Sequence, residues 1–131
     1  MRVVLDTNVL LSATVWRGSV ASKLLYKLLQ LQANIFCSNE IIREYKRVLK
    51  RDLDYSDEEV FELLEKVFSF VSLVYPKEKV SIVKEAPADD RIIECALASK
   101  SDYLVTYDKE LLKVVKYKSV KIVRPEELLR G

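Results

Sequence analysis

Short apolar runs alternate with amphipathic helical patterns along this chain, and that alternation limits the fold more than any other feature. Apolar, partly β-branched runs that are typical of buried strands occur at residues 2–5, 34–37, 71–75, 103–106 and 120–123. Between them, helical spacing and capping residues predict helices at 20–31, 39–50, 57–68 and 87–99, with short helices after 108 and 124. Strands that alternate with helices favour an α/β fold with a parallel sheet covered on both faces.

The length and composition favour a single globular domain over residues 1–131. Half of the 131 residues are hydrophobic and 32% are charged, which suits one proper core. No apolar run approaches the roughly 18 residues that span a bilayer. Met1 leads directly into the first strand, which leaves no room for a signal peptide. We therefore expect a cytoplasmic protein without a membrane partner.

The absence of histidine restricts the chemistry. Without histidine the chain has no Ser-His-Asp triad, no imidazole base and none of the common zinc sites. An enzyme of this composition must work with carboxylates, hydroxyls and lysines. The net charge of +2 does not demand a nucleic-acid partner, although a locally basic face is compatible with it. Cys37 and Cys95 are isolated in apolar surroundings and are expected to be buried, reduced thiols.

Acidic residues follow the ends of two predicted strands. Asp6 comes directly after the first strand, and Asp108 comes just after the strand at 103–106. Parallel strands place such residues at one edge of the sheet, where open α/β sheets bind ligands. In the helix at 39–50, Glu44 lies roughly 100° from the centre of the apolar stripe and can turn toward that edge. Glu40 lies roughly 140° away and is expected to point to water.

The helix that begins near Pro87 adds further acids to this edge. We expect Asp89 to be its N-cap, a structural role, and Asp90 to reach outward from the first helical position. Several carboxylates at one place repel one another unless a cation lies among them, and all-oxygen ligation suits Mg²⁺ or Mn²⁺. The predicted metal ligands and catalytic residues are Asp6, Glu44, Asp90 and Asp108. The residues expected to support these ligands are Thr7, Asn8, Glu94 and Thr106.

Four segments of the chain together resemble the PIN-domain ribonucleases. They are Asp6-Thr7-Asn8, Ser38 followed by Glu44, the segment from Asp90 to Ala98, and the segment from Leu104 to Asp108. The chain is most similar to the VapC-like toxin components of toxin–antitoxin pairs. The resemblance implies a three-layer α/β/α sandwich and a Mg²⁺- or Mn²⁺-dependent endoribonuclease that hydrolyses RNA phosphodiester bonds. It also implies an antitoxin protein as partner and a homodimer. Tyr107 departs from the small or basic residue of many relatives.

Basic residues cluster beside two of the predicted acids. A solvated charged surface explains any one of them, but their grouping predicts a track for the phosphate backbone of a nucleic acid. The residues predicted to form this track are Arg43, Lys46, Arg47, Lys109 and Lys113.

Two other classes of protein are considered beside the nuclease. A non-catalytic PIN-like module that binds RNA or protein would keep the fold without turnover. A phosphate-handling enzyme with an aspartate nucleophile resembles this chain only in Asp6, because its second acid would fall on Asn8. A receiver domain is disfavoured because it needs a pair of acids after the first strand.

Overall fold

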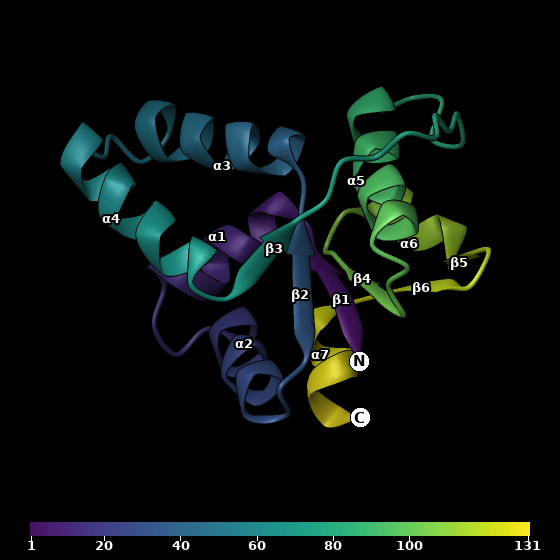
Figure 1. The fold of residues 1–131 in the computed structure, drawn as a ribbon, viewed down its shortest axis with the longest axis horizontal. Helices are drawn as coiled ribbons and strands as arrows, with labels where there is room; N and C mark the ends of the chain where they lie inside the picture. Colours follow the sequence, from purple (N-terminus) through teal and green to yellow (C-terminus); the bar gives the residue numbers. More distant parts are fainter.

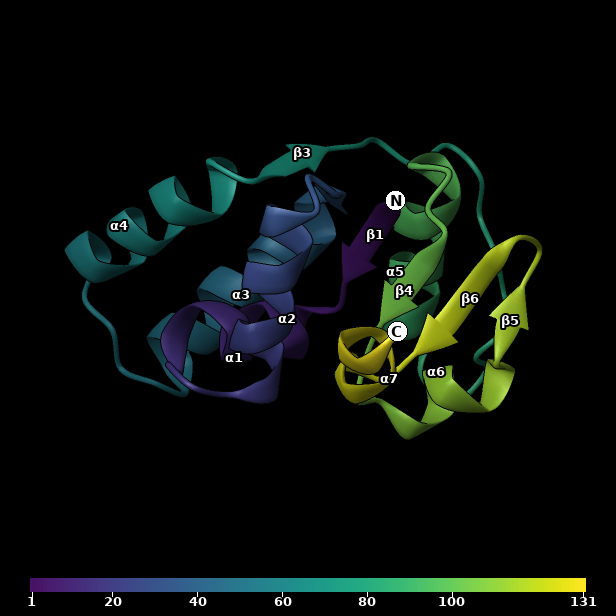
Figure 2. The same ribbon diagram turned by 90° about the horizontal axis from the view of Figure 1, so that it is seen from below.

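A six-stranded sheet forms the centre of the computed structural model, which describes residues 1–131. The strands lie in the order β3-β2-β1-β4-β6-β5, and only β5 pairs antiparallel to its neighbour. Figure 2 shows β3 at one edge of the sheet and the β5–β6 hairpin at the other. The strands are β1 (Arg2–Leu5), β2 (Asn34–Cys37), β3 (Val71–Leu73), β4 (Tyr103–Val105), β5 (Lys116–Tyr117) and β6 (Val120–Val123).

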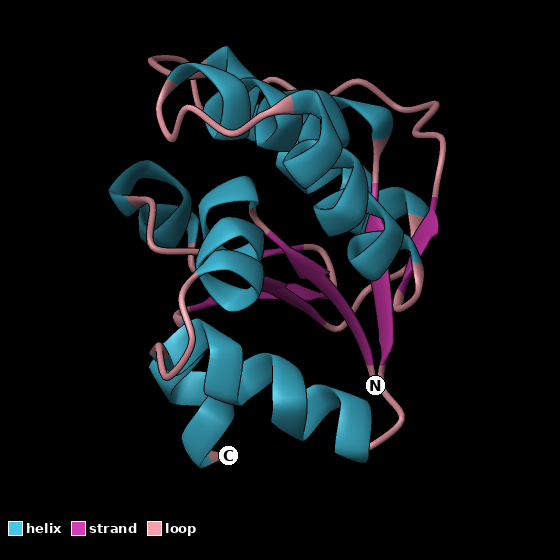
Figure 3. Cartoon of the chain, turned by 90° about the vertical axis from the view of Figure 1, so that its left-hand side faces the viewer, coloured by secondary structure: helices cyan, strands magenta, loops and turns pink.

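Seven helices surround this sheet, so the fold is an α/β/α sandwich with a mostly parallel sheet. The strands lie in the interior with the helices around them (Figure 3). Helix α5 packs on β1, β2 and β4, while α1 packs on α2 and α3, and α2 packs on α7. The helices are α1 (Thr7–Val15), α2 (Val20–Gln30), α3 (Asn39–Arg51), α4 (Asp57–Phe68), α5 (Pro87–Ala98), α6 (Lys109–Val114) and α7 (Pro125–Arg130).

The strand order reverses between β1 and β4, and this reversal defines the place of the candidate site. The chain proceeds from β1 to β2 and β3 on one side, then returns to lay β4 on the other side of β1. Such a switch point opens a crevice at the carboxyl ends of the two strands. Figure 1 shows these ends between α3 and α5, with both chain termini at the opposite end of the molecule.

Helix α1 is the one helix that the periodicity of the sequence does not predict. Its residues Val9, Leu10, Leu11 and Ala13 are all buried. A helix that is apolar on most sides lacks the polar face that makes helical spacing visible. The core contains 29 hydrophobic residues. Cys37 and Cys95 are among them as free thiols, as predicted, and burial raises the pKa of each to about 12.

Helix α4 differs from its prediction in which residues it buries. In the sequence, a capping box of Ser56 and Glu59 predicts the start of this helix, and helical spacing predicts a buried stripe of Val60, Phe61, Leu64, Val67 and Phe68. The capping box forms as predicted, but only Val60 and Val67 of that stripe are buried. Phe61 is 63% exposed and Phe68 is 45% exposed. The helix lies at the periphery, against α3 and β3, and therefore covers only part of that stripe.

The seven helices are all too short, or not apolar enough, to span a membrane.

Candidate functional site

A cleft of about 450 Å³ lies at the carboxyl end of β1, between α3 and α5. Most of its lining residues are charged or polar. The acidic lining residues are Asp6, Glu40, Glu44, Asp89 and Asp108, and the basic ones are Arg43, Arg47 and Arg91; Thr7, Asn8, Ala88 and Ile92 complete the lining. The strand-end acids and Glu44 therefore meet at one place, as the strand order requires.

Asp6 and Asp108 are held by hydrogen bonds at the ends of β1 and β4. The Oδ1 atom of Asp6 accepts a hydrogen bond from the backbone N–H of Thr7 at 2.6 Å, which makes Asp6 the N-cap of α1. Its Oδ2 atom accepts one from the hydroxyl of Thr106 at 2.6 Å. The Thr106 hydroxyl in turn accepts a hydrogen bond from the backbone N–H of Asp108 at 2.9 Å. Thr106 thus links the two acids and fixes their separation.

Helix α3 brings both of its glutamates to the cleft. Ser38 accepts a hydrogen bond from the backbone N–H of Ile41 and caps the helix, so α3 begins where the sequence predicts. Glu44 is half-buried and forms an ion pair with Arg47. Glu40 lies one turn earlier and is exposed, but it also lines the cleft, so its expected direction toward bulk water was only partly right.

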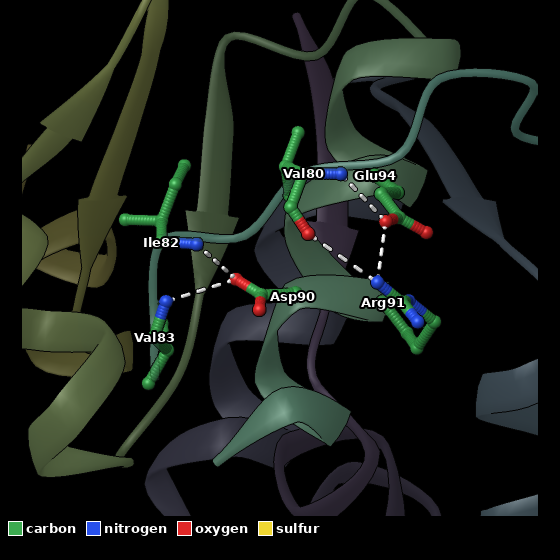
Figure 4. A network of polar contacts seen from close by, with 6 residues as sticks. All are labelled: Val80, Ile82, Val83, Asp90, Arg91 and Glu94. Carbon is green, nitrogen blue, oxygen red and sulfur yellow. Dashed lines mark hydrogen bonds and ion pairs between the residues drawn. The ribbon is translucent and has the colours of Figure 1, made fainter. Parts of the chain in front are cut away.

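The predicted positions of Asp89 and Asp90 were wrong. Helix α5 begins at Pro87 with Ala86 as its N-cap, and Asp89 makes no capping hydrogen bond. Asp89 lies in the third helical position and faces the cleft. Asp90 is only 3% exposed, and its Oδ1 atom accepts hydrogen bonds from the backbone N–H groups of Ile82 and Val83, both at 3.0 Å (Figure 4). Asp90 therefore binds the preceding loop and does not line the cleft.

Three other predicted positions lie outside the cleft. Glu94 is 3% exposed and accepts hydrogen bonds from Arg91 and from the backbone N–H of Val80, so it faces the loop rather than the strand-end acids. Lys109 and Lys113 are exposed on α6, and Lys113 pairs with Glu110. Neighbouring residues of a helix point about 100° apart, so assigning the cleft-facing position to Asp90 in place of Asp89 selected a side chain that points elsewhere.

Two more residues differ from what the sequence suggested. Lys46 is exposed and does not line the cleft, whereas its neighbours Arg43 and Arg47 do. Arg91 also lines the cleft and was not predicted. The sequence signal for Arg91 is its spacing from Glu94, three residues later on the same helix. This spacing allows the ion pair that the structure contains, and the pair holds the Arg91 side chain in position.

The acids of the cleft interact strongly with one another. Burial raises the pKa of Asp89 to about 7, with further contributions from the nearby charges of Asp108 and Asp6. Burial also raises the pKa of Asp6, although hydrogen bonds from Thr106 and Thr7 oppose the change. The Oδ2 atom of Asp89 is buried without a hydrogen-bond partner. No three acidic or cysteine side chains are arranged closely enough to hold a metal ion as they stand.

The raised pKa of Asp89, which comes from burial and from the charges of Asp108 and Asp6, can be tested in metal-free protein. A carboxyl group with a pKa of about 7 in the folded chain and an ordinary value of 3.8 in the unfolded chain opposes folding as pH rises through that window. We expect the melting temperature in chelator to fall between about pH 4 and pH 7 more steeply for the wild type than for Asp89→Asn, and the difference in slope to disappear above that range. Equal slopes for the two proteins would show that Asp89 is not the group responsible.

The protein is an α/β/α sandwich with an acidic cleft at the switch point of its sheet. Comparison with known proteins identifies its family. A family model described as "PIN domain" matches residues 2–110. The chain therefore belongs to the PIN-domain family. Among solved structures, VapBC2 from Rickettsia felis, bound to a DNA fragment from its promoter, has a chain that is 16% identical with a TM-score of 0.64. That match covers 93% of this chain and 98% of the other, and it shows a shared fold. No curated protein matches the chain.

Proposed function

We propose that this protein is a metal-dependent endoribonuclease and the toxin of a toxin–antitoxin pair. The observation that carries the proposal is the convergence of five carboxylates on one cleft at the strand switch point of a PIN-domain fold. We assign catalytic and metal-binding roles to Asp6, Glu44, Asp89 and Asp108. Asp89 takes the role that the sequence pattern gave to Asp90, because only Asp89 lines the cleft.

The donor groups of the cleft are of the kind that a hard divalent cation, Mg²⁺ or Mn²⁺, prefers, although the acids would have to move closer together to hold it. All candidate ligands are carboxylate oxygens, which these ions prefer. The buried Oδ2 atom of Asp89 has no other partner. Burial raises the pKa of Asp89 most, and the charges of Asp108 and Asp6 raise it further; a bound cation would neutralise these charges. When bound, such an ion polarises a phosphate oxygen and neutralises charge that develops during displacement at phosphorus.

The chain's own residues suit hydrolysis of a phosphodiester by water. Asp6 is fixed on two sides by Thr7 and Thr106, so its carboxylate keeps one orientation during the reaction. The carboxylates are the only lining groups that can take a proton from an attacking water near neutral pH, since the remaining polar groups are arginines, an amide and a hydroxyl. The arginines offer charge to the phosphate backbone on either side of the reacting group.

The direct test is cleavage of a labelled single-stranded RNA by purified protein. We expect fragments in Mn²⁺ or Mg²⁺ and none in excess chelator, with recovery when the metal is restored. A matched sample of Asp6→Asn should remain inactive under all these conditions, which excludes a contaminating nuclease. RNA that binds but is never cut in either metal would support the non-catalytic binding module instead.

The proposed partners are an antitoxin protein and a second copy of this chain, and each has its own test. The fold that the chain shares with VapBC2 supports an antitoxin protein, which would suppress cleavage when added in equal amount. The exposed Phe61 and Phe68 of α4 support a homodimer, because large exposed aromatic side chains are common at protein interfaces. The mass of the protein in solution tests this second point.

A further inference from the structure

Arg91 is a cation held in place at the edge of an acidic cleft. Its Nη2 atom donates to Oε2 of Glu94 at 2.6 Å and to the carbonyl oxygen of Val80 at 3.4 Å. Figure 4 shows these contacts on one side of α5 and the Asp90 contacts with the loop on the other. The Arg91 side chain is 34% exposed, and the residue lines the cleft together with Asp89.

The guanidinium of Arg91 has donors that the protein leaves unused. Its Nε atom is buried without a hydrogen-bond partner, one of only two such side-chain atoms in the structure. The other is Oδ2 of Asp89, in the same cleft. A buried donor without a partner is unfavourable unless a ligand satisfies it. The planar fork of arginine matches the oxygens of a phosphate group.

The ion pair with Glu94 holds the Arg91 side chain in this position. Glu94 is 3% exposed, and a buried carboxylate requires charge compensation and hydrogen bonds. Arg91 provides the first, and the backbone N–H of Val80 provides a hydrogen bond at 2.9 Å. The loop that supplies Val80 is itself bound to α5 by Asp90. Arg47, by contrast, is paired with Glu44 inside the cleft, and Arg43 is exposed and forms no ion pair.

We propose that Arg91 binds a backbone phosphate of the RNA substrate and that Glu94 is the positioning residue that orients it. This inference rests on the proposed function, because it names the group that contacts the substrate of that same cleft. None of the site residues predicted from the sequence provides this contact with a phosphate. Arg91 and Asp89 both belong to the N-terminal half of α5, and both line the cleft that would hold the RNA.

Equilibrium binding of a fluorescently labelled single-stranded RNA tests the proposal apart from cleavage. All variants are made in the Asp89→Asn background, so that the RNA stays intact. We expect Arg91→Ala to weaken binding by about tenfold, as for the loss of one charged hydrogen-bonding group. The slope of log K against log salt is negative, and it should become less steep by about 0.7, which is the contribution of one phosphate contact with a single strand. Arg91→Lys should restore the slope and part of the affinity.

Two further variants separate positioning from simple stability. Glu94→Gln should weaken binding in the presence of Arg91 but add nothing to Arg91→Ala, because it acts through that guanidinium. Arg130→Ala removes the same charge from the exposed end of α7 and should leave binding unchanged. Melting curves confirm that each variant is folded, and Arg91→Gln, which also removes the charge, replaces Arg91→Ala if that variant does not fold.

The outcomes distinguish this inference from the proposed function. Wild-type protein that neither binds nor cleaves RNA would overturn the function itself. RNA that is cleaved and bound, with affinity and salt slope unchanged in Arg91→Ala, would overturn only the role of Arg91. A Glu94→Gln effect that persists in full in Arg91→Ala would show that Glu94 acts only on the fold.

Discussion

Asp89→Asn is expected to lower RNA cleavage by on the order of 100-fold or more while leaving the protein folded. The Oδ2 atom of Asp89 is buried without a hydrogen-bond partner, and this side chain makes no capping hydrogen bond to α5. Removing its charge relieves repulsion from Asp108 and Asp6, so the melting temperature of metal-free protein should rise. Initial cleavage rates at saturating Mn²⁺, together with melting curves in chelator, measure both effects.

Asp90→Ala is the matched control for this prediction, because the two acids are adjacent and only one of them lines the cleft. Alanine leaves the backbone N–H groups of Ile82 and Val83 without their acceptor. Each orphaned buried donor costs about 1–3 kcal/mol, so the melting temperature should fall. Cleavage measured well below the melting temperature should decrease much less than in Asp89→Asn. The opposite ranking of the two variants would return Asp90 to the catalytic role and make Asp89 structural.

The position of Asp89 shows where reasoning from sequence fails in this chain. An aspartate before a helical pattern is a favourable N-cap, and this preference placed the start of α5 at Asp89. Pro87 is a stronger signal, because proline is favoured at the first helical position, and the structure begins α5 there. The observed N-cap, Ala86, lies three residues before the assigned one, and Asp89 rather than Asp90 faces the cleft. Helix boundaries therefore decide site assignments even where the helix itself is predicted correctly.

The strand ends were predictable for a different reason. Asp6 follows the buried apolar residues of β1, and the change from apolar to polar side chains at Asp6 marks the end of the strand. Asp108 is fixed in the same way by β4 and by its capping hydrogen bond to Glu110 at 2.8 Å. Parallel pairing of β1 with β4 then brings both acids together without further information.

The contacts of the loop before α5 could not be foreseen. Residues 74–86 contain no regular element, and their backbone N–H groups are bound by Asp90 and Glu94 from a helix that follows later in the chain. Such pairings depend on the three-dimensional path of the loop rather than on local spacing. The same holds for Arg91, whose position in the cleft follows from the direction of α5.

RNA cut by this protein is expected to carry a 5′-phosphate on one fragment and a 3′-hydroxyl on the other. Attack by the ribose 2′-hydroxyl generally needs an acid–base pair, and the chain has no histidine to supply the usual imidazoles. In the proposed reaction a water oxygen bonds to phosphorus as the bond from phosphorus to the 3′-oxygen breaks, and a cleft carboxylate takes the proton from water. The departing 3′-oxygen gains a proton from solvent.

Labelling of the fragment ends decides between these two chemistries. A 5′-phosphate blocks transfer of labelled phosphate by a kinase until a phosphatase removes it, whereas a 5′-hydroxyl is labelled directly. An internal control is an RNA with 2′-deoxyribose at the cleaved position, which water attack still cuts and 2′-hydroxyl attack does not. A 2′,3′-cyclic phosphate, or loss of cleavage at the deoxyribose position, would reject hydrolysis by water. In either case the carboxylates of the cleft would have to act on the ribose rather than on water.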